Sequence, residues 1–121
     1  MKLNIPADGT KIGHDGNKLI VPDNPIIPYI IGDGIGIDVT PVMKRVLDYA
    51  VNKAYGNKRE IKWLELYAGA NSKELYGSIL PTETIEAMRD YRISIKGPLT
   101  TTIGTGHKSI NVMIRQKLDL Y

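Results

Sequence analysis

Cysteine and phenylalanine are both absent from the 121 residues of this chain. Without cysteine, neither a disulfide framework nor a thiolate metal site can form. Long apolar runs are absent as well, since no stretch approaches the roughly 18 consecutive apolar residues that cross a bilayer. The first residues, Met1–Pro6, lack the apolar segment of a signal peptide. These absences predict a cytoplasmic protein with no membrane partner.

Positive charge is in small excess, because 16 Lys and Arg residues stand against 13 Asp and Glu residues and give a net charge of +3. Most basic residues alternate with acidic ones, which is typical of ordinary solvated surface. One denser basic group departs from this pattern, and no aromatic residues interleave with it as they do in surfaces that bind single-stranded nucleic acid. We therefore expect no nucleic-acid partner, and a small anionic ligand suits this group better. Its members are His107, Lys108, Arg115 and Lys117.

The chain is otherwise of globular composition, with 42% apolar and 24% charged residues, so disorder is not expected. Residues 1–25 read as a polar entry segment. Within it, Asp15-Gly16 lies between short apolar stretches, which predicts a β-hairpin. Pro25 and Pro28 then mark the approach to the core.

The core is predicted to occupy residues 26–121 in the order β-α-β-α-β-α. Residues 26–31 form an apolar, β-branched strand, and apolar residues between Val39 and Ala54 recur at offsets of three and four, which predicts an amphipathic helix of about four turns with Pro41 in its first turn. Residues 61–67 alternate as a second strand. This order predicts an α/β protein with a mainly parallel sheet flanked by helices.

Three further elements complete the predicted core. A short helix follows Thr82, a third strand at residues 93–95 ends in Lys96-Gly97-Pro98, and Ser109 opens a last helix. The chain stops just past that helix, apparently at the start of another strand. We therefore expect residues 1–121 to be an incomplete, amino-terminal portion of a larger domain.

Ligands in an open parallel sheet collect beyond the carboxyl ends of the strands, where two loops are predicted here. The first loop, residues 32–38, has glycine at three alternate positions. Its spacing differs from the dinucleotide fingerprint, and Asp33 would repel a pyrophosphate. A tight structural turn is therefore favoured over a cofactor loop.

The second loop, residues 96–109, combines threonines, glycines and two lysines and leads directly into a helix. Such a helix start is a ready anion site, although Ser109 could be a plain helix cap instead. Asn111 and Arg115 are four residues apart and share one helix face. Arg115 can hold a carboxylate with two parallel hydrogen bonds, but an arginine that only faces solvent is the commoner outcome.

Several of these motifs together resemble bacterial NADP-dependent isocitrate dehydrogenases. The resemblance covers essentially the whole chain, and the Gly-Asp-Gly-Ile-Gly loop alone is shared with the wider family of isopropylmalate and homoisocitrate dehydrogenases. The pair Ser109-x-Asn111 narrows the choice to isocitrate. The segments that carry the resemblance are NPIIPYIIGDGIGIDVTP at 24–41, IKGPLTT at 95–101 and KSINVMIRQKLDLY at 108–121.

The resemblance implies a role for five residues. Ser109, Asn111 and Arg115 would bind the carboxylates of isocitrate, and Thr100 would contact the nicotinamide. Lys96 would lie near both substrate and nicotinamide. Ser109 also matches the serine that is phosphorylated in some bacterial members of the family.

The resemblance also implies the amino-terminal part of the family's large domain, in an enzyme that oxidises and decarboxylates isocitrate with NADP and Mg²⁺ or Mn²⁺. The metal ligands, the remaining catalytic groups and the residues that choose NADP over NAD would lie outside this segment. The complete protein would be a homodimer, and residues 1–121 alone would be inactive. Two alternatives stay open: an isopropylmalate or homoisocitrate dehydrogenase, and a non-catalytic anion-binding fragment of the family. The sequence departs from the family at Thr105, His107 and Lys108.

Overall fold

The structure, a computed structural model, describes residues 1–101 and 108–121. Its strands are β1 (Gly13–Asp15), β2 (Lys18–Ile20), β3 (Ile26–Ile30), β4 (Lys62–Leu66) and β5 (Ile95–Lys96). Its helices are α1 (Gly36–Tyr55), the 3₁₀ turn η1 (Gly56–Lys58), α2 (Ala70–Tyr76), α3 (Thr82–Tyr91) and α4 (Ile110–Leu118). No helix in the described ranges is long and apolar enough to span a membrane.

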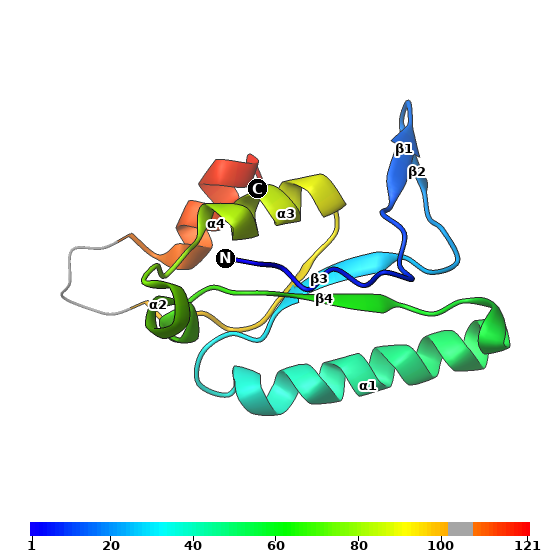
Figure 1. The fold of residues 1–121 in the computed structure, drawn as a ribbon, viewed down its shortest axis with the longest axis horizontal. Coiled ribbons are helices and arrows are strands. Elements are labelled where there is room, and N and C mark those ends of the chain that lie inside the picture. Colours follow the sequence, from blue (N-terminus) through cyan, green and yellow to red (C-terminus); the bar gives the residue numbers. More distant parts are fainter. Residues whose placement is uncertain (102–107) are drawn as a thin grey trace.

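The main sheet has three parallel strands in the order β4-β3-β5. Strand β3 is central, and its last residue, Ile30, is in register with Leu66 of β4 and Lys96 of β5. Helix α1 runs along one face of the sheet, and α3 and α4 lie on the other (Figure 1). This arrangement confirms the predicted α/β class with a parallel sheet flanked by helices.

The hydrophobic core lies between the sheet and the helices α3 and α4. Side chains alternate along a strand, so every second residue of β3 and β4 points to this side. The buried residues that form the core are Ile26, Ile30, Leu64, Leu66, Ala68, Ile85, Ala87, Met88, Tyr91, Leu99, Ile110 and Ile114. Helix α4 is therefore held against the sheet by Ile110 and Ile114, which leaves its other positions available for a site.

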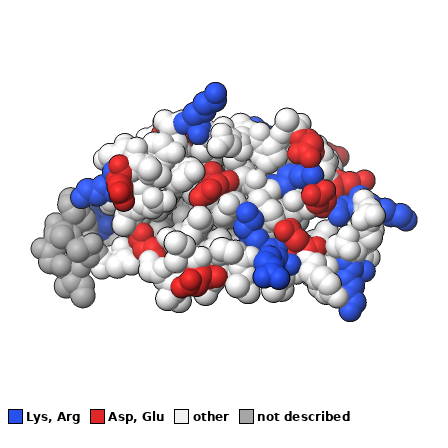
Figure 2. Space-filling view, turned by 60° about the horizontal axis from the view of Figure 1, so that its bottom comes forward, with Lys and Arg blue, Asp and Glu red and all other residues white. Residues whose placement is uncertain are grey.

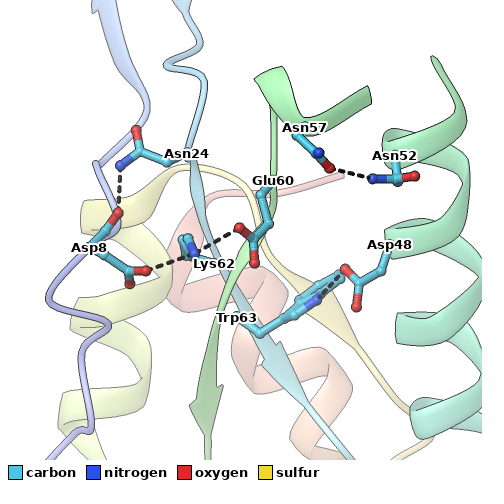
Figure 3. A network of polar contacts seen from close by, with 8 residues as sticks. All are labelled: Asp8, Asn24, Asp48, Asn52, Asn57, Glu60, Lys62 and Trp63. Carbon is cyan, nitrogen blue, oxygen red and sulfur yellow. Dashed lines mark hydrogen bonds and ion pairs between the residues drawn. The ribbon is translucent and has the colours of Figure 1, made fainter. Parts of the chain in front are cut away.

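The opposite face of the sheet holds α1 through aromatic and polar contacts. The rings of Tyr29 and Trp63 pack edge to face with centroids 5.8 Å apart. The Lys44 amine lies 4.3 Å from the Tyr29 ring centroid and donates a hydrogen bond of 3.2 Å to its hydroxyl. The Trp63 indole N–H donates to Asp48 at 2.8 Å (Figure 3). Because Lys44 and Asp48 both belong to α1, these contacts fix the helix on the sheet.

The amino-terminal segment is tied to the start of β4 by a small polar network. The Lys62 amine lies 2.7 Å from an Asp8 carboxylate oxygen and 3.0 Å from Glu60 (Figure 3). The Asn24 amide donates to the backbone carbonyl of Asp8. The hairpin predicted around Asp15-Gly16 is present as β1 and β2, and it projects from the body of the molecule (Figure 1).

Two predicted elements differ from the structure, and one helix of the structure was not predicted. Helix α1 begins at Gly36 and has 20 residues, so it is longer than four turns and Pro41 lies inside it rather than in its first turn. Helix α2 was not predicted. Strand β5 contains only Ile95 and Lys96, because the chain turns sharply at Arg92 (φ 67°) and the N–H of Ile93 donates to the Tyr91 carbonyl at 2.8 Å.

The carboxylate of Asp33 connects the segments that follow the three strands. Its two oxygens accept hydrogen bonds from the backbone N–H groups of Ala70 and Thr100, each at 2.9 Å. Its own N–H donates to the Pro98 carbonyl at 2.6 Å. One side chain in the loop after β3 thus holds both the first residue of α2 and the segment after β5. The predicted loop at 32–38 therefore contains a braced structural turn, as the sequence favoured, and its last three residues already belong to α1.

Two glycines make this close packing possible. A Cβ atom at Gly97 would lie 1.9 Å from the Ile31 carbonyl oxygen, and one at Gly69 would lie 2.5 Å from Asp33 Oδ1. Gly69 also has a φ of +88°, which L side chains rarely adopt. Only glycine at these positions lets the three loops approach one another.

The outer side of α1 carries an apolar stripe formed by Val39, Val42 and Val46. These side chains recur at offsets of three and four, and they are 45%, 57% and 61% exposed. On the face that Figure 2 shows, with the lower side of Figure 1 turned forward, the charged groups of both signs are scattered among uncharged surface. The amphipathic pattern predicted for α1 is therefore real, but only part of its apolar surface is buried by described residues.

Replacing Asp33 by Asn should lower the free energy of unfolding. The Asn side chain has one acceptor oxygen, so its NH₂ group would face one of the two backbone N–H donors. Loss of a hydrogen bond to a charged group costs about 1.5–3 kcal/mol. Urea unfolding checks this, with Asp15→Asn on the exposed hairpin as the control. Equal midpoints for the two variants would contradict the bracing role.

The stripe on α1 should make a polypeptide of residues 1–121 self-associate and bind hydrophobic dyes, because exposed apolar patches promote both. The double change Val42→Glu and Val46→Lys should reduce dye binding and the associated fraction in light scattering. Its melting temperature should stay near that of the parent, since exposed substitutions usually change stability by less than about 0.5 kcal/mol. Unchanged association in the double variant would assign that behaviour to another surface.

Candidate substrate site at the start of α4

Helix α4 begins directly after Ser109, on the carboxyl-end side of the sheet. The first intrahelical hydrogen bond runs from the Met113 N–H to the Ser109 carbonyl at 2.9 Å. The Ser109 side chain makes no capping hydrogen bond with the helix backbone. Ser109 thus occupies the cap position through its backbone alone, and its hydroxyl is used elsewhere.

Two side-chain hydrogen bonds join the start of α4 to the segment after β5. The Thr101 hydroxyl donates to Ser109 Oγ at 3.0 Å, and the Asn111 amide donates to the Leu99 carbonyl at 3.1 Å. Leu99 is buried in the core, and the N–H of Thr100 is held by Asp33. The start of α4 is therefore attached to a segment that is itself fixed to the end of the sheet.

Lys96 and Arg115 bring two positive charges to the same corner. The side chain of Lys96 is exposed, but neighbouring protein atoms displace part of its hydration and lower its pKa, and the positive charge of Arg115 lowers that pKa further. The Lys96 amine donates to the Gly97 carbonyl at 2.7 Å. Within residues 1–101 and 108–121, no carboxylate lies within ion-pair distance of either cation. Two cations that repel each other without a partner favour an anionic ligand.

The groups gathered here suit a ligand with more than one carboxylate. Ser109 offers a hydroxyl proton, Arg115 a planar guanidinium and Lys96 an ammonium. Asn111 has one amide hydrogen engaged by Leu99, so its carbonyl oxygen can still accept from a ligand hydroxyl or amide. In the described part of the chain, no group of three or more His, Cys, Asp or Glu side chains could hold a metal ion.

The structure brings most of the residues singled out in the sequence into one region. Ser109 and Asn111 are half-buried on the start of α4, while Arg115 is exposed one turn further along. Thr100 is exposed in the segment that follows β5, and Lys96 is the last residue of β5. Residues 102–107, which include Thr105 and His107, lie outside the described ranges.

Two residues of this region were missed by the sequence interpretation. Thr101 was not distinguished from its threonine neighbours, because nothing local shows that its hydroxyl contacts Ser109 eight residues later. Asp33 was considered only as a charge that would repel a pyrophosphate, but its bonds to Ala70 and Thr100 span 37 and 67 residues. Contacts of such length leave no spacing pattern.

Comparison with known proteins shows a consistent relationship. Residues 26–121 match the family described as isocitrate/isopropylmalate dehydrogenase. The chain is 57% identical over 122 residues to an NADP isocitrate dehydrogenase of Colwellia maris, covering 99% of this chain and 29% of that protein. It is 54% identical over 121 residues to the NADP isocitrate dehydrogenase of Coxiella burnetii, covering 98% of this chain and 28% of that protein.

A solved structure supports the same relationship. The crystal structure of isocitrate dehydrogenase from Methylococcus capsulatus superposes with a TM-score of 0.66 and 37% sequence identity, over 79% of this chain and 26% of that one. The chain thus spans less than a third of the length of the relatives it matches. With a family match over residues 26–121 and this level of identity, the chain belongs to the isocitrate/isopropylmalate dehydrogenase family.

Proposed function

We propose that this chain supplies part of the substrate site of an NADP-dependent isocitrate dehydrogenase, which oxidises and decarboxylates isocitrate to 2-oxoglutarate. The observation that carries the proposal is the gathering of Ser109, Asn111, Arg115 and Lys96 at the start of α4. The names of the relatives, which are NADP isocitrate dehydrogenases, support the choice of substrate and cofactor.

The proposed contacts follow from the chemistry of isocitrate, which carries three carboxylates and a hydroxyl. Arg115 would hold one carboxylate with two parallel hydrogen bonds, and Ser109 would donate its hydroxyl proton to the distal carboxylate. Isopropylmalate has an alkyl group in place of that carboxylate. A hydroxyl left without a partner against an alkyl group disfavours binding, so Ser109 would discriminate between the two substrates.

The remaining parts of the catalytic site belong to the same proposal. Thr100 and Lys96 would lie beside the nicotinamide of NADP and orient it toward the substrate. Mg²⁺ or Mn²⁺ would stabilise negative charge on oxygen during decarboxylation. The resemblance implies that the ligands of that ion belong to other parts of the complete protein. The complete enzyme would be a cytoplasmic homodimer.

A substrate panel tests the proposal against its alternatives. The complete protein is assayed for NADPH or NADH formation with isocitrate, isopropylmalate and homoisocitrate in the presence of Mg²⁺. Turnover of isocitrate with NADP supports the proposal, and preference for another substrate assigns the chain to a different member of the family. No turnover of any of them would favour a non-catalytic anion-binding role.

Phosphorylation of Ser109 would block the proposed site. A phosphoryl group carries nearly two negative charges and would occupy the place of the substrate carboxylate. The half-buried hydroxyl is bonded to Thr101, so its modification would require this hydrogen bond to open.

Substitutions of Ser109 should separate substrate binding from helix capping. In Ser109→Asp, two like charges about 4 Å apart repel by roughly 4 kcal/mol at an effective dielectric constant near 20, or about a thousandfold in binding. Ser109→Ala should lose one hydrogen bond to a charged group, about 1.5–3 kcal/mol. The kcat/KM for isocitrate should therefore fall further in the Asp variant. If Ser109 were only a cap, Asp would be the milder change, and wild-type activity in that variant would end the substrate assignment.

Replacing Lys96 by Met should stabilise the ligand-free protein and weaken its response to isocitrate. Because the folded pKa of Lys96 lies below its ordinary value of 10.5, the charged form opposes folding at neutral pH. This penalty fades as pH rises through the folded pKa toward 10.5. Melting temperatures should therefore be higher for Lys96→Met than for wild type at pH 7, and the gap should shrink at higher pH.

The same experiment includes isocitrate and a control. Isocitrate should raise the melting temperature of the wild type more than that of Lys96→Met, because a bound carboxylate favours the charged lysine. Lys18→Met, on the exposed hairpin, should change neither the melting temperature nor its rise with isocitrate. A destabilised Lys96→Met protein with a full isocitrate response would contradict this role.

A further inference from the structure

The hydroxyl groups of Thr101 and Ser109 are in hydrogen-bond contact, with Thr101 Oγ1 and Ser109 Oγ 3.0 Å apart. A serine hydroxyl has one proton and two acceptor sites. Because the Ser109 side chain makes no capping bond to the helix, its oxygen can accept from Thr101 while its proton donates to a ligand.

We infer that Thr101 is a positioning residue that sets the orientation of the Ser109 hydroxyl for a carboxylate ligand; this role rests on the proposed function. A hydroxyl that accepts a hydrogen bond becomes a better donor, because chains of hydrogen bonds polarise one another. The contact also favours the Ser109 rotamer that faces Thr101. A bound carboxylate only accepts hydrogen bonds, so Ser109 then donates to the carboxylate and Thr101 donates to Ser109.

The peptide unit that joins Leu99 and Thr100, directly before Thr101, is held at both its N–H and its carbonyl. The N–H of the preceding Thr100 is bonded to Asp33, and the carbonyl of Leu99 is bonded to Asn111. The Thr101 hydroxyl thus contacts Ser109 from a segment whose backbone is fixed to the end of the sheet. Two independent hydrogen bonds join residues 99–101 to residues 109–111. When the Thr101 hydroxyl is removed, the bond between Asn111 and Leu99 therefore still holds the start of α4 in place. A substitution at Thr101 should consequently change the orientation of the Ser109 hydroxyl without displacing α4.

The test uses the complete dehydrogenase with Thr101→Val, which keeps the shape and removes the hydroxyl. The KM for isocitrate should rise about fivefold, the effect of one neutral hydrogen bond, while the KM for NADP and the melting temperature stay unchanged. Thr101→Ser restores a hydroxyl and should return the KM to within about twofold of wild type. Thr10→Val, at an exposed threonine of the amino-terminal segment, is the matched control and should behave as wild type.

The same change in a Ser109→Ala background separates positioning from general stability. Thr101→Val should add nothing there, because its only proposed target is gone. An unchanged KM in Thr101→Val, or an equal rise in the Ser109→Ala background, would overturn the role of Thr101 alone. A wild-type protein that does not use isocitrate would instead overturn the proposed function on which that role rests.

Discussion

The carboxylate of Asp33 is the constraint on which the rest of this structure depends. A parallel sheet leaves its carboxyl-end loops without strand partners, and each loop still has backbone N–H groups that need acceptors. Asp33 supplies two charged acceptor oxygens to Ala70 and Thr100 from different parts of the chain, and such charge-assisted bonds are stronger than neutral ones. The segment that carries the proposed site residues is placed by this one side chain.

The sequence predicted the elements whose signals are local. Strand β3, strand β4, the hairpin and α1 follow from apolar periodicity and turn residues within each segment. Helix α2 has exposed Leu75 and Tyr76, and its start is bonded to Asp33, 37 residues away, so its own residues gave little signal. The third strand was misplaced because the turn at Arg92 places Ile93 outside the sheet.

In the proposed site, too, some features have a local sequence signal and others depend on contacts between distant residues. Ser109, Asn111 and Arg115 could be selected because helical spacing and residue type are both visible in the sequence. The distinction between a capping serine and one that bonds Thr101 could not, since both are compatible with a serine at a helix start. Here the hydrogen bonds of α4 decide: the Ser109 side chain gives the helix none, and its hydroxyl oxygen is held by Thr101.

Lys96 differs from the cations that the fold pairs with carboxylates. Lys62 lies between Asp8 and Glu60, and Arg59 lies 3.2 Å from Asp23, so these cations are balanced within the fold. Lys96 instead lies near the positive charge of Arg115, and its lowered pKa reflects partial loss of hydration and this repulsion together. Groups held in such unfavourable surroundings reduce stability and are often kept where function needs them. A polyanion bound between them would relieve the repulsion, so the same arrangement that weakens the ligand-free corner strengthens its hold on a carboxylate-rich ligand.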